Sequence, residues 1–305
     1  MGQPQSGVLP DANLHAAFLT FMMGSGDGAA ARVRQAAAGL PAMTAEVAKL
    51  DPAAGLVSVI AMGDRVWDDL YPEARPAGLA PFQAFADGGR TAPATGADLF
   101  LHLRADRRDL VFALTHRVRE ALGGAVTVIE EIHGFRYLDK RDLTGFVDGT
   151  ENPQGDDARS DVALVGDGAF AGGSFVNVQR YVHDLAKWDT LSVQQQEDII
   201  ARTKADDVEY PSERKPPTAH IKRVSIKEDG ASLEILRHSM PYGSADEHGL
   251  YFVAYAGRAD TFARMLEAMI VADAEGHYDH LMDYSRAVTG AAFFAPPIEW
   301  LERHG

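Results

Sequence analysis

Residues 98–103 (DLFLHL), 106–122 (DRRDLVFALTHRVREAL) and 125–132 (AVTVIEEI) decide the fold of the first half of this chain. The first stretch alternates in polarity and the third is rich in β-branched residues, and both patterns are typical of strands. Between them, Leu110 and Leu114 belong to a set of apolar residues at helical spacing. The three stretches therefore predict a strand, a helix and a second strand.

The preceding residues predict the same order. Residues 15–23 (HAAFLTFMM) form an apolar run, residues 27–50 are rich in alanine at helical spacing, and residues 55–62 (GLVSVIAM) have the character of a buried strand. Together the two units give the βαββαβ order of a ferredoxin-like fold. We therefore expect residues 1–138 to form one ferredoxin-like half.

The second half, residues 139–305, repeats this order more loosely. Its polar, glycine-rich segment at residues 145–173 is predicted to be a long ordered loop, and such loops tend to carry function. We predict an α+β fold of two duplicated ferredoxin-like halves with antiparallel sheets. The other elements expected here are strands at residues 174–182, 220–226, 232–237, 250–255 and 291–295, and helices at residues 185–203 and 261–272.

The composition excludes several classes of protein. The 29 Lys and Arg residues against 44 Asp and Glu residues give a net charge of −15, which opposes binding to nucleic acid or to anionic membranes. The absence of cysteine excludes disulfides, zinc–thiolate sites, iron–sulfur clusters and a thiolate haem ligand. Because no leader segment and no bilayer-length apolar run are recognisable, we expect a cytoplasmic protein with neither a membrane nor a nucleic-acid partner.

A motif of nine residues lies in the polar loop. Residues 145–153 read GFVDGTENP, and the central Asp-Gly-Thr alone would indicate only a turn. The whole string resembles the GxxDG signature of the dye-decolourising peroxidases. Residues 218–223 (TAHIKR), 234–243 (EILRHSMPYG) and 248–255 (HGLYFVAY) resemble, in order, the family's proximal ligand segment, its distal arginine segment and the strand that follows. The compact length is most similar to the B-type members.

This resemblance implies a peroxidase with haem b (iron protoporphyrin IX) bound in the second half. In such an enzyme His220 is the single axial ligand, and hydrogen peroxide is reduced through a high-valent iron-oxo intermediate that then oxidises organic donors such as dyes and phenols. Asp148 would move a proton between the two peroxide oxygens. Arg237 would stabilise negative charge on the departing oxygen. Because an ordinary carboxylate has a pKa near about 4, we expect an acidic pH optimum.

The resemblance also implies a set of residues around the haem. Arg223 is one of four basic residues that could pair with the propionates or could simply form a solvated face, the others being Arg214, Lys215 and Lys222. Ser239 stands where actinobacterial B-type members often have Asn. The full set of expected haem contacts is Phe146, Val147, Gly149, Thr150, Arg223, Ser239 and Phe252.

An axial histidine needs an acceptor for its second ring nitrogen, preferably a carboxylate. Asp283 is our expected acceptor for His220, with Asp273 as its competitor. Sequence alone fixes such hydrogen-bond partners poorly, and Asp283 could equally be an ordinary acid at a helix end.

Two other functions stay open at this point. The first is a haem carrier or haem-handling protein, including one that removes iron from haem, without useful peroxidase turnover. The second is a non-haem metal site built from His238, His248, His277 and His280. We also expect a homo-oligomer. The chain ends at residues 302–305 (ERHG) without the tail that some relatives use to dock into encapsulin shells, so we expect no shell loading.

Overall fold

The computed structural model describes residues 2–305, and its first half folds as the sequence predicts. Four antiparallel strands are joined in the order β2-β5-β1-β6, which is the strand order of a ferredoxin-like sheet. Two helices connect the strands and cover one face of this sheet. The elements of this unit are β1 (His15–Met23), α1 (Ala29–Ala48), β2 (Val57–Gly63), β5 (Leu99–Ala105), α3 (Arg108–Leu122) and β6 (Val126–Phe135).

The second half has the same strand order, β10-β12-β7-β14, with β11 also paired to β12 and β13 to β7. The predicted duplication of the ferredoxin-like unit is therefore confirmed at the level of topology. The elements of this unit are β7 (Ser174–His183), α5 (Leu185–Trp188), α6 (Val193–Ile200), α7 (His220–Val224), β10 (Leu236–Arg237), β11 (Met240–Gly243), β12 (His248–Ala256), α8 (Thr261–Ile270), β13 (Ser285–Ala287) and β14 (Ala291–Ala295).

Shorter elements lie between these. They are the helices α2 (Asp64–Leu70), α4 (Asp156–Ala163) and α9 (Ile298–Arg303), the 3₁₀ turns η1 (Pro52–Ala54), η2 (Gly123–Ala125) and η3 (His280–Asp283), and the hairpins β3 (Phe85–Asp87) with β4 (Arg90–Ala92) and β8 (Lys227–Glu228) with β9 (Ala231–Ser232). Within the part of the chain that the structure describes, none of the helices combines the length and the apolar character needed to cross a lipid bilayer.

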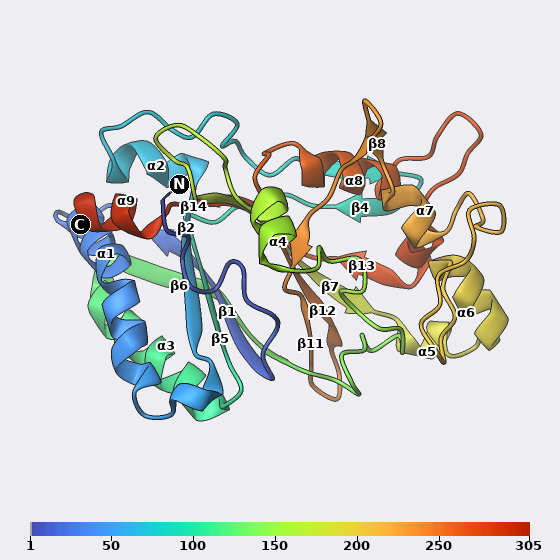
Figure 1. Cartoon of the computed structure of the whole chain (residues 1–305), viewed down its shortest axis with the longest axis horizontal. Helices are drawn as coiled ribbons and strands as arrows, with labels where there is room; N and C mark the ends of the chain where they lie inside the picture. The colour runs from blue at the N-terminus through green and yellow to red at the C-terminus, as the bar shows by residue number, and fades with distance from the viewer. Residues whose placement is uncertain (1) are drawn as a thin grey trace.

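Strand β14 joins the two halves into one sheet, because it pairs with β7 on one side and with β2 on the other. The sheet bends so that the helix-free faces of the two halves pack together. Phe18 of β1, for example, stacks on Tyr251 of β12 with ring centroids 4.4 Å apart. In Figure 1 the strands therefore lie between α1 and α3 on the left and α5 to α8 on the right. This packing explains why every residue of β5 is buried.

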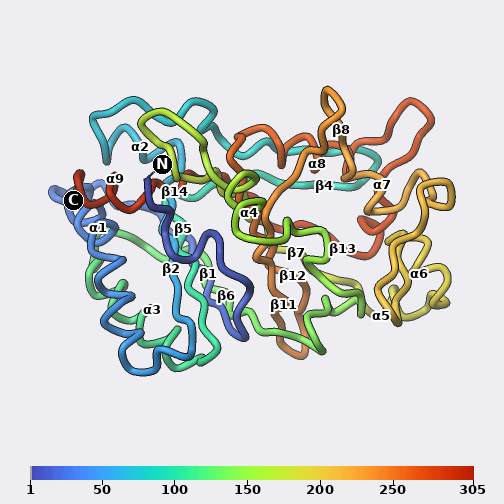
Figure 2. The backbone as a smooth tube through the Cα atoms, viewed as in Figure 1, coloured from blue at the N-terminus to red at the C-terminus, as the bar shows by residue number. Residues whose placement is uncertain are grey.

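The end of the chain returns to the first half. Helix α9 packs against α1, and the ring of Trp300 lies 5.2 Å from that of Trp67 in the core of the first half. The tube in Figure 2 shows the C-terminus beside α1. A division of the chain after residue 138 stays a prediction.

Four predicted elements differ from the structure. The loop expected at residues 145–173 contains helix α4. Residues 220–226 were expected as a strand, but residues 220–224 form helix α7, in which Ile221 and Val224 have the i, i+3 spacing of a helix face. The expected helix at residues 185–203 is divided, because the capping box of Ser192 and Gln195 starts α6 anew. The expected strand at 232–237 is interrupted, since its middle residues form a wall of a cavity.

Candidate active site

A cavity of about 310 Å³ opens in the second half, between the loop at residues 142–151, helices α7 and α8, and the segment that ends in β10. This volume is within the range of roughly 300–1,000 Å³ that is typical of cofactor and ligand pockets. Phe252, Met265 and Leu281 are among the apolar residues that line it. Charged groups are confined to a few positions, so their arrangement decides the chemistry.

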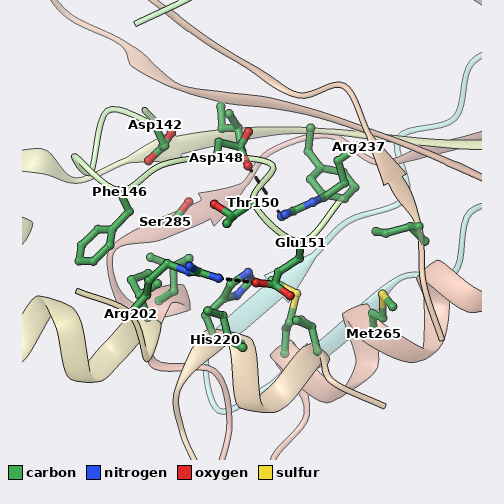
Figure 3. Close-up of a pocket in the computed structure, with 18 of the residues that line it drawn as sticks. Asp142, Phe146, Asp148, Thr150, Glu151, Arg202, His220, Arg237, Met265 and Ser285 are labelled. Carbon is green, nitrogen blue, oxygen red and sulfur yellow. Dashed lines mark hydrogen bonds and ion pairs between the residues drawn. The ribbon is translucent and has the colours of Figure 1, made fainter. Parts of the chain in front are cut away.

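The imidazole of His220 lines one wall of the cavity. His220 is the first residue of α7, and Figure 3 shows it opposite Asp148 and Arg237. Its Nδ1–H donates to Oδ2 of Asp279 at 2.6 Å, and Asp279 has no solvent exposure. Two backbone hydrogen bonds hold Asp279 there, from His280 N to Thr218 O and from Asp279 N to Met269 O. With Nδ1 used in this way, Nε2 is left as a basic lone pair for a ligand.

Asp148 and Arg237 share the facing wall. Nη1 of Arg237 lies 3.7 Å from Oδ1 of Asp148, and about four-fifths of each side chain is buried. Burial raises the pKa of the Asp148 carboxyl above its usual value, and the nearby Asp142 carboxylate raises it further, whereas the guanidinium of Arg237 opposes both. The pair therefore places a weakly basic carboxylate beside a permanent positive charge.

The backbone of Asp148 is held by the connection between the two halves. Its N–H donates to the carbonyl oxygen of Lys140 at 2.8 Å. Leu138, Asp139 and Lys140 have φ values of 29°, 58° and 69°. This is a left-handed backbone conformation that residues other than glycine rarely adopt. Such strain persists where the surrounding structure holds it and is concentrated at functional sites.

A second buried acid lines the same cavity. Oδ1 of Asp142 accepts from Nε2 of His183 at 3.1 Å, and Oδ2 accepts from the N–H and the hydroxyl of Thr144. Nδ1 of His183 in turn contacts Oγ of Ser285 at 2.8 Å. Burial alone would raise the pKa of Asp142, but His183 and Thr144 outweigh burial and lower it to about 2. Asp142 is therefore a fixed negative charge in the wall.

Arg202 is a cationic group that sequence reasoning missed. Its side chain is 8% exposed, lines the cavity and forms an ion pair with Glu151 of the motif loop. It also lies 3.4 Å from Oδ1 of Asp207. Arg202 follows α6 in the sequence and meets Glu151 only in the folded chain, so no local pattern in the sequence marks it.

Some of the residues expected around a haem line the cavity, and others lie outside its lining. Phe146, Val147, Thr150 and Phe252 line the cavity, as do His220, Asp148 and Arg237. Gly149 lies behind the wall, where its φ of 79° allows the turn of the motif. Ser239 also lies outside the lining, and its hydroxyl accepts from Val253 N.

Two expected roles are wrong. Asp283 does not contact His220; its carboxylate accepts from the Tyr278 hydroxyl, because η3 carries it away from α7. Its competitor Asp273 binds the guanidinium of Arg223 at 2.7 Å. Arg223, expected at the propionates, is thereby turned outside the cavity lining. The acceptor for His220 is Asp279, which was not among the acids considered.

The non-haem alternative has no support in the geometry. Among residues 2–305, the one set of three metal-ligating side chains close enough to share an ion is Asp273, Glu275 and His277. His238 instead hydrogen-bonds the backbone of Val8 in the core. The four histidines of that hypothesis therefore do not converge on one site.

Comparison with known proteins agrees with this geometry. Residues 5–136 match the family model "Dyp-type peroxidase, N-terminal" and residues 139–300 match "Dyp-type peroxidase, C-terminal". The dye-decolorizing peroxidase of Mycolicibacterium paratuberculosis is 41% identical over 98% of this chain and 85% of that protein.

Solved structures are similarly close. A Dyp-type peroxidase protein from Shewanella oneidensis has a TM-score of 0.95 at 45% identity and covers 99% of both chains. A variant of DypB from Rhodococcus jostii, solved in complex with heme, has a TM-score of 0.94 at 39% identity over 98% of this chain and 97% of its own. Because the two family models span nearly the whole sequence, this chain belongs to the Dyp-type peroxidase family and is an oxidoreductase that acts on hydrogen peroxide.

Proposed function

We propose that this chain is a haem-dependent peroxidase in which His220 binds the haem iron and Asp148 and Arg237 act on hydrogen peroxide at the opposite face. The observation that carries the proposal is the facing arrangement in one cavity. The imidazole of His220, backed by a buried carboxylate, lies on one wall, and a carboxylate–guanidinium pair lies on the other. Haem needs one strong axial ligand and one open position, and this arrangement meets both needs.

The residues present fit haem b. Nε2 of His220 would hold the iron, and the apolar side chains of Phe146, Phe252 and Met265 would contact the porphyrin. Arg202 also lines the cavity, and a guanidinium suits a propionate carboxylate. When bound, haem supplies a redox-active iron whose oxidation drives the two-electron reduction of hydrogen peroxide to water.

The two distal residues divide the remaining work. Asp148 in its carboxylate form takes the proton from one peroxide oxygen and delivers it to the other, which leaves as water. Arg237 stabilises the negative charge that develops on the leaving oxygen. A haem carrier would need neither group in the open face of its pocket, so the pair favours catalysis over storage or iron removal.

The test uses protein expressed with haem and mixed with one equivalent of hydrogen peroxide in a stopped-flow spectrometer. We expect a rapid change of the Soret band in the wild type, loss of bound haem in His220→Ala, and slow reaction with haem retained in Asp148→Ala. His116→Ala, which removes an exposed histidine of α3, is the matched control and should behave as the wild type. Slow bleaching in every protein alike, or release of metal-free porphyrin, would contradict the proposal.

Several finer properties belong to the same proposal. We propose that the reducing substrates are small organic donors such as dyes and phenols, and the name of the relative, dye-decolorizing peroxidase, supports the dyes. Because burial raises the pKa of Asp148, we propose that the pH optimum lies above the one expected for an ordinary carboxylate. We also propose a cytoplasmic location and a homo-oligomeric state. Light scattering after size-exclusion chromatography measures the mass of the particle and tests the last of these.

A further inference from the structure

The side chain of Asn152 joins the motif loop to the strand of Arg237. Its Nδ2 donates to the carbonyl oxygen of Arg237 at 2.8 Å, and its Oδ1 accepts from the N–H of Arg237 at 2.9 Å. Strand β10 pairs with β12 along its other edge, where His238 N donates to Val253 O. The carboxamide therefore occupies the place that a peptide group of a neighbouring strand would take.

Asn152 is coupled closely to Asp148. Its N–H donates to the carbonyl oxygen of Gly149 at 3.1 Å, which closes a tight turn directly after Asp148. The loop is tied at two further points, by the Thr150 hydroxyl to Asp207 and by Glu151 to Arg202. A displacement of Asn152 relative to Arg237 would therefore move Asp148 as well.

The two distal side chains are close without being hydrogen-bonded to each other. Their nearest atoms are 3.7 Å apart, beyond the usual hydrogen-bond length and within the range of an ion pair. A tighter contact would occupy groups that must act on peroxide, and a wider one would remove the charge of Arg237 from Asp148. From this we infer that Asn152 is a positioning residue that sets the separation of Asp148 and Arg237, an inference that rests on the proposed function.

The chemistry of the side chain explains why a carboxamide is used. Only Asn and Gln present a donor and an acceptor in one plane, so only they can bond both backbone groups of Arg237. In Asn152→Asp the Arg237 N–H keeps an acceptor, but the Arg237 carbonyl faces a second negatively charged oxygen. In Asn152→Ala both backbone groups lose their partner.

The test compares wild type, Asn152→Ala, Asn152→Asp and Gln154→Ala. Gln154 is the matched control, because its amide bonds the backbone oxygen of Asn152 in the same loop and does not touch Arg237. The rate constant with peroxide is measured across a pH series, and crystal structures of the haem-free proteins give the separation of Asp148 and Arg237. The charged and titratable groups near Asp148 are Arg237, Asp142 and His220.

We expect Asn152→Ala to widen the separation and to slow the reaction by about 10- to 100-fold, the size of loss that small misplacements of reacting groups cause. The acid limb of its pH profile should move to higher pH, because Arg237 no longer opposes protonation of Asp148. Asn152→Asp should change the separation, the rate constant and the pH profile in the same direction as Asn152→Ala. If the alanine variant does not fold, the aspartate variant is used for the test in its place. Gln154→Ala should match the wild type in all three measurements.

The outcomes separate this inference from the function on which it rests. An Asn152→Ala protein with an unchanged separation, rate and pH profile overturns the inference, even if its melting temperature falls. A wild type that does not react with peroxide while the variant still shows a wider separation overturns the proposed function and leaves Asn152 as the positioning residue.

Discussion

Nδ1 of His220 and Oδ2 of Asp279 lie 2.6 Å apart, and Asp279 is fully buried. A carboxylate with no access to water is costly unless it accepts strong hydrogen bonds. Asp279 accepts one from His220 and one from the N–H of Leu281. The hydrogen bond that Nδ1–H donates to this carboxylate makes the imidazole a stronger electron donor through Nε2.

Asn in place of Asp279 should therefore weaken the axial ligand. We expect the midpoint potential of the ferric/ferrous couple to rise in Asp279→Asn, because the neutral amide no longer stabilises the higher oxidation state. The rate constant with peroxide should fall by roughly 10- to 100-fold, the usual size of such effects. Spectroelectrochemistry measures the potential. Asp283→Asn is the control, since that acid contacts Tyr278 instead, and an equal shift in both variants would contradict the assignment.

Removal of the distal guanidinium tests charge stabilisation. Arg237→Leu should retain haem, because the residue is on the wall opposite His220, and should react with peroxide about 10²- to 10³-fold more slowly. Arg237→Lys keeps the charge but loses the planar set of donors, so it should recover only part of the rate. Stopped-flow absorbance gives the rate constants. A leucine variant with the wild-type rate would remove Arg237 from the mechanism.

The pH dependence tests Asp148. Burial raises the pKa of Asp148, and only its deprotonated form can accept a proton from peroxide. The rate constant should therefore fall as the pH drops through this raised pKa. This acid limb of the pH–rate profile should move to higher pH in Arg237→Leu, because that variant lacks the positive charge that opposes protonation of Asp148. The limb should disappear in Asp148→Asn. A limb that survives in Asp148→Asn would belong to another group.

The catalytic residues were predictable from sequence where the signal is local. Asp148 lies inside a nine-residue motif, and His220 and Arg237 lie in segments that resemble their counterparts in the family. Asp279 could not be chosen in this way, because it is 59 residues from His220 and the chain around it carries several equivalent acids. A backbone bond between His280 and Thr218 helps to bring the two segments together in the folded chain.

The fold, like the site, could be predicted where the pattern lies within one element, and could not be predicted where it depends on contacts between distant segments. Alternation and helical spacing predicted β1, α1, β5 and α3 because each pattern lies within one element. The pairing of β14 with both β2 and β7 joins segments from opposite ends of the chain, and it has no local signature. Residues 220–224 were misread as a strand because β-branched residues at i and i+3 suit either structure over so short a segment.

Asp142 should contribute stability that depends on pH. Its pKa in the folded protein is about 2, below the usual 3.8, so its contribution is fully present above pH 3.8 and is lost as the pH falls through about 2. The difference corresponds to about 2 kcal/mol. We expect Asp142→Asn to lower the free energy of unfolding by about this amount at pH 7, and the gap from wild type to close in strong acid. Urea unfolding at several pH values measures it.

The exposed loop residue Asp167 is the matched control, and Asp167→Asn should change the free energy of unfolding by less than about 0.5 kcal/mol. Equal stability of Asp142→Asn and wild type at pH 7 would mean that the cost of burying the carboxylate cancels its bonds to His183 and Thr144. In that case the buried pair would hold the shape of the cavity wall without stabilising the fold.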